Sequence, residues 1–228
     1  MDESNPTFTP IEQSKDETAD TKEAKGMPYR ELIGGLLYLS TINRQVIYSK
    51  RYIRSRHVEN PKHHHWIQAK RILTYLRGTT DYGILYNGNK KLALYSDADF
   101  AGNLEDRRST SGYLLMYSGG AVSWHSRKQR TVALSTAEAE YVSASEAIRK
   151  MPFMRKFGLE LKMLSKEPTI MYVDNNSAIH MITKKDKKAS KHIDIKYHFV
   201  KEKIGTEITV EHIATNSWVI YLQTTSSD

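Results

Sequence analysis

Apolar residues recur along this chain at two different spacings, and the changes of spacing divide it into elements. Between residues 31 and 53 and between residues 63 and 78 they recur every three or four positions, which predicts two amphipathic helices. Short apolar runs separated by Asn-Gly and Gly-Gly turns follow, so we expect an antiparallel meander. Its predicted strands are residues 82–86, 92–95, 112–117 and 121–125, with residues 130–134 as a possible continuation.

The second half of the chain alternates helical and strand-like stretches. Ser135 or Thr136 is a typical helix cap ahead of a helical pattern that runs to Arg149. The remaining predicted elements are helices at 152–164, 175–182 and 193–204 and strands at 169–173 and 208–213. A run of antiparallel strands followed by helices and single strands predicts an α+β protein with a mixed sheet.

Three acidic residues stand where these elements begin or end. Asp97 closes the apolar strand of LALYSDADFAG, Asp174 closes that of TIMYVDNNSAI, and Glu140 lies in the helix that begins LSTAEAEY. A carboxylate at the end of a buried strand is costly unless a positive charge compensates it, and divalent metals bind such oxygen ligands. If the two strands are parallel neighbours, the three acids meet. The pattern predicts a two-metal phosphodiesterase site with these residues as metal ligands and catalytic groups.

Two further acids are weaker candidates for the same site. Glu138 and Glu140 are two positions apart on a helix, so only one of them can face inward. Ala144 and Ala147 continue the face of Glu140, which favours Glu140. Asp99 lies in the turn after the strand and has the alternative role of binding the loop backbone. Taken singly, each acid is also explained as a solvated turn residue or a helix cap.

The net charge of the chain indicates that the ligand of this acidic site is a polyanion. The 228 residues carry a net charge of +8. Residues 1–25 hold seven acids and three lysines, a balance of −4, so the rest of the chain carries +12. A basic body around an acidic cluster suits a nucleic acid held at a metal site. Lysine and arginine that only keep the surface soluble are the alternative.

Composition also excludes several classes of protein. There is no cysteine, which excludes disulfides and thiolate metal sites. No Gly-x-Ser-x-Gly stretch is present, which argues against a serine hydrolase. No apolar run approaches membrane-spanning length and residues 1–20 are acidic and polar, so we expect an intracellular protein, cytoplasmic or nuclear, without a signal peptide or membrane partner.

Basic and small polar side chains follow the first acid along the chain. We expect them to contact phosphate and sugar oxygens of a bound nucleic acid, and a solvated hairpin is the alternative. The predicted contact residues are Arg107, Arg108, Ser109, Thr110, Arg127, Lys128 and Gln129.

Longer blocks around these residues match a known pattern. They read YSDADFAG, DRRSTSGYLL, VSWHSRKQRTVALSTAEAEY, YVDNNSAI and KHIDIKYHFVKEKI, and they resemble successive motifs of the ribonuclease H domain in copia-type retrotransposon Pol polyproteins. Upstream, PYRELIGGLLYLS and NPKHHHWIQAKRILTYLRGTTDYGILY resemble the segment that joins the reverse transcriptase of that family to its ribonuclease H. The resemblance covers residues 28–213.

The resemblance implies a ribonuclease H-like α+β fold, with a mixed sheet of about five strands flanked by helices and preceded by a short helical segment. It implies endonucleolytic cleavage of RNA in RNA–DNA hybrids at a two-metal site for Mg²⁺, or Mn²⁺, and it maps the family acids onto Asp97, Glu140 and Asp174. The implied partners are an RNA–DNA hybrid and the upstream reverse transcriptase domains. Along the chain it implies a helical reverse transcriptase remnant at 27–88 and a ribonuclease H-like domain at 89–223. Residues 1–26 are rich in Asp, Glu, Thr and Ser and poor in large apolar residues, which predicts a disordered acidic tail.

Two departures from the family pattern define the alternative functions. The family closes with an acidic residue in a motif like Ala-Asp-Ile-Leu-Thr-Lys, but here the stretch reads ATNSWVIYLQTTSSD and Tyr221 takes the place of the acid. The fingers and palm of the reverse transcriptase are absent from the sequence, so we expect no polymerase activity and interpret the chain as a truncated copy. The second hypothesis is therefore a catalytically impaired, nucleic-acid-binding remnant of a transposon, and the third is a misfolding relic.

Overall fold

The computed structural model describes residues 5–7, 9–10, 24, 26–48, 57–102, 106–183 and 194–214. The chain divides into two compact units between Ile84 and Leu85, whereas the sequence placed the division after residue 88. Most of the predicted tail at 1–26 lies outside the described residues, as do residues 184–193 and Tyr221.

The described part of the first unit contains three α-helices and no strand. They are α1 (Tyr29–Ile42), α2 (Gln45–Tyr48) and α3 (His63–Gly78). The single helix predicted over 31–53 was wrong, because the chain turns at Asn43, whose N–H bonds the carbonyl of Leu39. The turn places Ile47 in the apolar core that α1 and α3 share, and burial of this side chain stabilises the unit. The buried members of that core are Tyr29, Ile33, Leu36, Ile47, Ala69, Ile72 and Tyr75.

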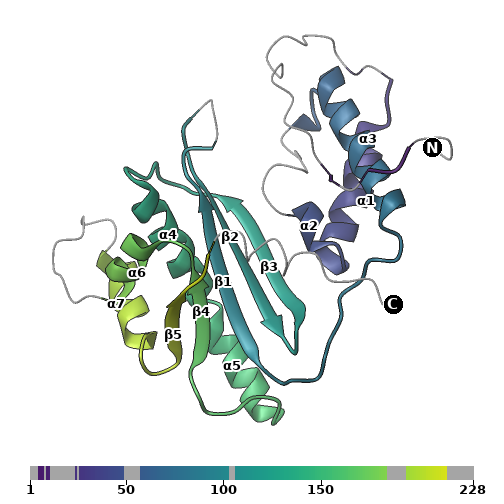
Figure 1. Ribbon diagram of the computed structural model, residues 1–228. Helices are drawn as coiled ribbons and strands as arrows, with labels where there is room; N and C mark the ends of the chain where they lie inside the picture. The colour runs from purple at the N-terminus through teal and green to yellow at the C-terminus, as the bar shows by residue number, and fades with distance from the viewer. Residues whose placement is uncertain are drawn as a thin grey trace. The chain divides into compact units, whose positions relative to one another are not determined.

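The second unit is built on one five-stranded sheet (Figure 1). Its strands are β1 (Leu92–Asp99), β2 (Thr110–Tyr117), β3 (Gly120–Lys128), β4 (Thr169–Val173) and β5 (Ile208–His212). They lie in the order β3-β2-β1-β4-β5, with β1, β2 and β3 antiparallel and β4 and β5 parallel to β1. The predicted α+β class and mixed sheet are confirmed.

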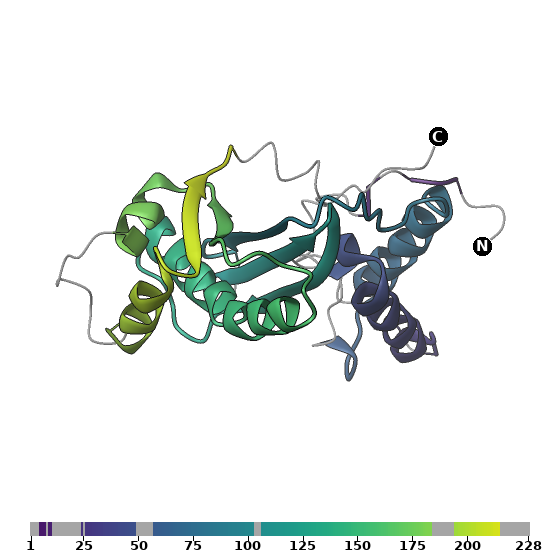
Figure 2. The same ribbon diagram turned by 90° about the horizontal axis from the view of Figure 1, so that it is seen from below.

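The helices of this unit contribute to one core with the sheet. They are α4 (Thr136–Ile148), α5 (Met151–Glu160), α6 (Asn176–Thr183) and α7 (Asp194–Lys203). Helix α4 contacts β1 and β2, and Figure 2 shows it lying against one face of the sheet. The core joins sheet residues such as Leu94, Leu115 and Met171 to helix residues such as Ala144 and Ile182. Burial of these side chains fixes the helix that carries the acids against the strand that carries Asp97.

Two predicted strands were wrong. Residues 82–86 form no ladder, because the segment that follows closes over the β2–β3 turn: Asn87 N–H donates to the Ser118 carbonyl, and Ser118 N–H donates to the Lys91 carbonyl. Residues 130–134 do not extend the meander, because the chain must leave the sheet there to reach the start of α4.

Candidate active site

Pairing between β1 and β4 places two acids at the same level of the sheet. The last parallel partners are Tyr95 and Tyr172, whose rings stack with centroids 4.9 Å apart. Asp97 and Asp174 each lie two residues further along their chains, and residues two apart in a strand face the same side. Asn175, next in the chain, accepts a hydrogen bond from the Ala178 N–H at 3.0 Å and so caps α6 directly after Asp174.

Helix α4 brings the third acid to the same edge. Its start is fixed by Ser135, whose hydroxyl accepts a hydrogen bond from the Glu138 N–H at 3.1 Å. Glu140, one turn into the helix, is only 6% exposed. Its Oε1 accepts a hydrogen bond from the Ala98 N–H at 3.0 Å, so the carboxylate is held directly beside the strand residue that follows Asp97.

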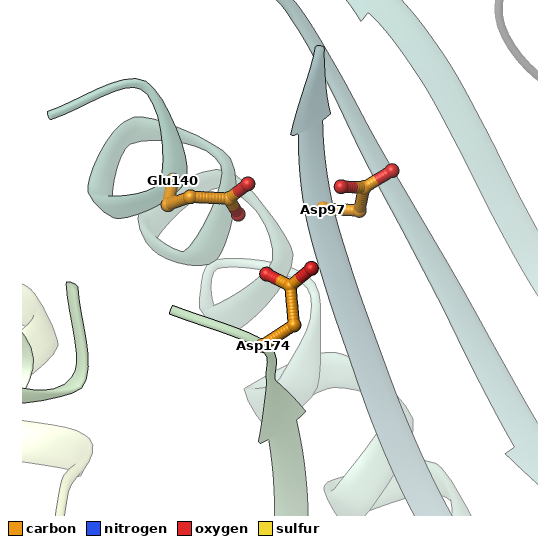
Figure 3. Close-up of side chains that lie close together, drawn as sticks. All are labelled: Asp97, Glu140 and Asp174. Carbon is orange, nitrogen blue, oxygen red and sulfur yellow. The ribbon is translucent and has the colours of Figure 1, made fainter. Parts of the chain in front are cut away.

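The three carboxylates converge, as Figure 3 shows. One oxygen from each of Asp97, Glu140 and Asp174 lies within 4.8 Å of the others, and no other group of three or more potential metal ligands is found among the described residues. At this separation two like charges repel by about 1 kcal/mol in water and by several times more near a protein surface. A positive charge bound between the three carboxylates would relieve this repulsion.

The donor set fits a hard divalent cation. All three donors are carboxylate oxygens, which suit Mg²⁺ and Mn²⁺ and not the soft metals that prefer thiolates. The residues come from a strand, a helix and the end of a second strand, which are rigid elements that hold ligands in place. The structure thus brings together the three residues that the sequence proposed as ligands.

The two weaker candidates do not join this cluster. Glu138 Oε2 accepts a hydrogen bond from the Leu134 N–H at 2.8 Å, so this carboxylate caps the start of α4. Asp99 ends β1, and its carboxylate occupies the space beside Gly102 that a side chain at that position would need. Glu138 thus serves the backbone at the start of its helix, and Asp99 packs beside Gly102.

Several predicted nucleic-acid contacts gather where β2 begins and β3 ends, next to the end of β1. Thr110 is the register partner of both Asp99 and Lys128, so the three lie in one row across the sheet. Lys128 forms an ion pair with Asp106, and Arg108 Nε lies 3.7 Å from the same carboxylate. These ion pairs, with Lys128 first, hold the pKa of Asp106 below its ordinary value. Arg107 and Arg127 are exposed and available to a ligand.

Burial argues against two of the predicted contacts. Ser109 is 0% exposed and Gln129 is 2% exposed. The Ser109 hydroxyl accepts from the Ala101 N–H, and the Gln129 amide bonds inside the unit. Direct contact of these two side chains with a nucleic acid does not fit this structure, because Ser109 already bonds the backbone that follows β1 and Gln129 already joins β2 to α4.

Two residues near the acids were not found from the sequence. Ser143 Oγ lies 2.7 Å from the Asp97 carbonyl oxygen, which ties α4 to β1. His212 Nε2 lies 3.1 Å from the Asp174 carbonyl oxygen, and because a carbonyl only accepts, Nε2 carries the proton in this contact. The available signal for His212 was its place at the end of β5, the parallel neighbour of β4.

Comparison with known proteins gives the family. No protein-family model matches the chain. It is 39% identical over 227 residues to the retrovirus-related Pol polyprotein from transposon TNT 1-94 of Nicotiana tabacum, covering 95% of this chain and 17% of that protein. Over 217 residues it is 32% identical to the retrovirus-related Pol polyprotein from transposon RE2 of Arabidopsis thaliana, covering 92% of this chain and 15% of that protein. The chain belongs to the retrovirus-related Pol polyproteins of transposons.

This Pol chain spans less than one fifth of the length of those two relatives. A shorter relative, secreted RxLR effector protein 161 of Plasmopara viticola, is 45% identical over 128 residues, which cover 55% of this chain and 90% of that protein. In the described part of the Pol chain no helix is long and apolar enough to cross a membrane.

Solved structures with a similar fold include ribonucleases H and a viral Pol protein. LC11-RNase H1 in complex with an RNA/DNA hybrid shares 14% identity at a TM-score of 0.41, covering 56% of this chain and 88% of that chain. The foamy viral protease-reverse transcriptase in complex with double-stranded DNA shares 13% identity at a TM-score of 0.48, covering 87% of this chain and 33% of that chain. The predicted architecture, a mixed sheet of five strands flanked by helices, is confirmed.

Proposed function

We propose that the ribonuclease H-like domain of this Pol chain hydrolyses the RNA strand of RNA–DNA hybrids in a reaction that depends on Mg²⁺. The observation that carries the proposal is the convergence of Asp97, Glu140 and Asp174, with one oxygen of each within 4.8 Å of the others. The copia-type resemblance of the surrounding motifs supports the choice of substrate over the other reactions that this fold serves.

The roles of the chain's own residues follow from their positions. Asp97 and Asp174 hold cations at the sheet edge, and Glu140 completes the ligand set from α4, its own carboxylate steadied by the Ala98 N–H. Bound divalent cations supply activation of the attacking water and neutralisation of charge on the scissile phosphate and leaving oxygen. His212 steadies the backbone at Asp174 through the Asp174 carbonyl.

The basic residues of the β2–β3 end bind the substrate in this proposal. Lys128 lies on the row of Asp99, on the strand face that also carries Asp97. Arg127 directly precedes it in the chain, and Arg108, which follows Arg107, contacts the same Asp106 carboxylate as Lys128. Their contacts with phosphates position the hybrid and make binding sensitive to salt. Residues 27–88 are proposed as the end of a reverse transcriptase, so the upstream domains of a full Pol polyprotein are proposed partners.

Cleavage of an end-labelled RNA–DNA hybrid with Mg²⁺ tests the function. We expect Asp174→Asn to abolish cleavage while hybrid binding persists, because the ligand set is broken but the basic surface is intact. Glu160→Gln, which removes an exposed acid on α5, is the charge-matched control and should cleave as the wild type does. Cleavage that survives Asp174→Asn would show that another site, or a contaminating nuclease, is responsible.

Tyr221 favours a second candidate, a binding protein without nuclease activity. In that case the wild type binds the hybrid in a salt-dependent manner and cleaves it at no concentration of Mg²⁺ or Mn²⁺. The same assay separates the two functions.

A further inference from the structure

Gln129 follows β3 directly and turns its side chain into the domain. Its backbone N–H donates to the Ser109 carbonyl at 2.8 Å, which adds one bond to the β2–β3 ladder. Its side-chain nitrogen donates to Ser111 Oγ and to the Ala139 carbonyl, both at 2.9 Å. Because a carbonyl can only accept, the contact with Ala139 determines which end of the amide faces α4.

These contacts close a ring around Glu140. Ala139 directly precedes Glu140 in α4, and the Ala98 N–H donates to Glu140 Oε1 at 3.0 Å. Ala98 of β1 is in turn the register partner of Ser111 of β2. The start of α4 is therefore fastened to the same pair of strand positions twice, once through Gln129 and Ser111 and once through the carboxylate itself.

Ser143 adds a fastening one turn later. Its Oγ lies 2.7 Å from the Asp97 carbonyl oxygen and 3.1 Å from the Gly112 carbonyl oxygen. A serine inside a helix commonly bonds a carbonyl of its own preceding turn, so the use of strand carbonyls instead ties the helix to β1 at Asp97. The separation between Asp97 and Glu140 is thus set by hydrogen bonds on both sides of Glu140.

Gln129 carries a cost that stability alone does not explain. Its Oε1 is buried and accepts no hydrogen bond within the part of the chain that the structure describes. A buried acceptor without a partner destabilises the folded state, and an apolar side chain of the same shape avoids that penalty. Methionine would serve folding nearly as well, but it cannot supply the amide bridge from Ser111 to Ala139.

We propose that Gln129 is a positioning residue that holds the Glu140 carboxylate where it shares divalent cations with Asp97 and Asp174. This inference rests on the proposed function in so far as the three carboxylates are a metal site. Metal affinity depends on ligand atoms being held in place, and loss of a group that supports a ligand weakens affinity by about 10–100-fold.

Binding of Mn²⁺ to the 228-residue chain, followed by the EPR signal of the free ion, tests the inference apart from cleavage. Gln129→Met should weaken Mn²⁺ binding roughly tenfold, while the thermal midpoint in EDTA stays close to that of the wild type. Ser111→Ala, which removes the strand end of the bridge, should shift affinity in the same direction and provides a second variant if the first does not fold. Ser135→Ala is the matched control: it weakens the cap of the same helix without touching the bridge, so it should lower the midpoint and leave Mn²⁺ affinity unchanged.

The outcomes separate this inference from the nuclease function. Unchanged Mn²⁺ affinity in Gln129→Met, in a protein whose wild type binds Mn²⁺ in an Asp97-dependent manner, would overturn the inference even if the hybrid is cleaved. Equal losses in Gln129→Met and Ser135→Ala would overturn it too, because helix stability alone would then explain both. Weakened binding in Gln129→Met without any cleavage by the wild type would support the positioning role and reject the nuclease. A wild type that binds no Mn²⁺ would overturn both.

Discussion

Replacing Asp97 by asparagine should stabilise the metal-free protein. Asn keeps the size of Asp and one acceptor oxygen, but it replaces the other oxygen by an NH₂ donor and removes one of three negative charges that lie within 4.8 Å of one another. At that separation a pair of like charges costs about 1 kcal/mol at the dielectric of water and about 3.5 kcal/mol at an effective dielectric of 20. Asp97 is half-buried and has two such neighbours, so the substitution relieves at least about 2 kcal/mol.

Thermal unfolding in EDTA and in Mg²⁺ measures this effect. A gain of about 2 kcal/mol raises the melting temperature of a domain of this size by roughly 4–8 °C, so Asp97→Asn should melt higher than the wild type in EDTA. Excess Mg²⁺ should then stabilise the wild type, by about 2.7 kcal/mol at one hundred times the dissociation constant, and stabilise the variant much less. Adding metal should therefore bring the two melting temperatures closer together or reverse their order.

Two results would refute this reasoning. A variant that melts below the wild type in EDTA would mean that the Asp97 carboxylate is held by favourable contacts that outweigh the repulsion. Equal stabilisation of both proteins by Mg²⁺ would mean that the ion binds elsewhere. Glu160→Gln, which removes an exposed acid paired with Lys156, controls for the general effect of one negative charge on this basic protein.

Three further predictions address the surroundings of the site. Asp106→Asn frees Lys128 from its ion pair, so it should tighten hybrid binding roughly two- to fivefold in a fluorescence anisotropy titration; the same gain in a Lys128→Met background would contradict this. Burial lowers the pKa of His125, so the stability that neutral His125 contributes is complete above about pH 6.5 and is lost as the pH falls through the lowered pKa. Melting curves of His125→Gln should depend less on pH below about 6.5, and an unchanged profile would count against the assignment. Tyr221→Asp should raise the rate of hybrid cleavage if the family's last acid is what the chain lacks, and a rate equal to that of the wild type would show that three acids suffice.

The elements around the acids were predictable because their patterns depend on local spacing. Strand β4 has the predicted bounds, and α4 begins after Ser135 as its cap and Glu138 indicated. The sequence allowed us to predict that Asp97 and Asp174 lie together, because a carboxylate at the end of a buried strand is costly unless a bound charge compensates it, and one cation can compensate both. The apolar run at 82–86 gave the same local signal as a strand, but whether such a run finds a ladder depends on the free edges of the sheet, which the sequence does not state.

Small polar residues were the least predictable, since Ser109, Gln129 and Ser143 look alike in sequence whether they face solvent or backbone. In the structure each bonds main-chain groups across elements. Their burial follows from the path of the chain between β3 and α4, which is a tertiary property.

The acids differ from these residues in the kind of contact that the fold imposes on them. A buried serine or amide that bonds a carbonyl lowers the free energy of the folded state, so folding alone accounts for it. Three carboxylates brought within 4.8 Å by β1, α4 and the end of β4 raise it. Hydrophobic burial and hydrogen bonding give no reason for three separate elements to deliver like charges to one point. A positively charged ligand would explain why the three carboxylates meet. For that reason we propose this cluster as the catalytic site of the domain.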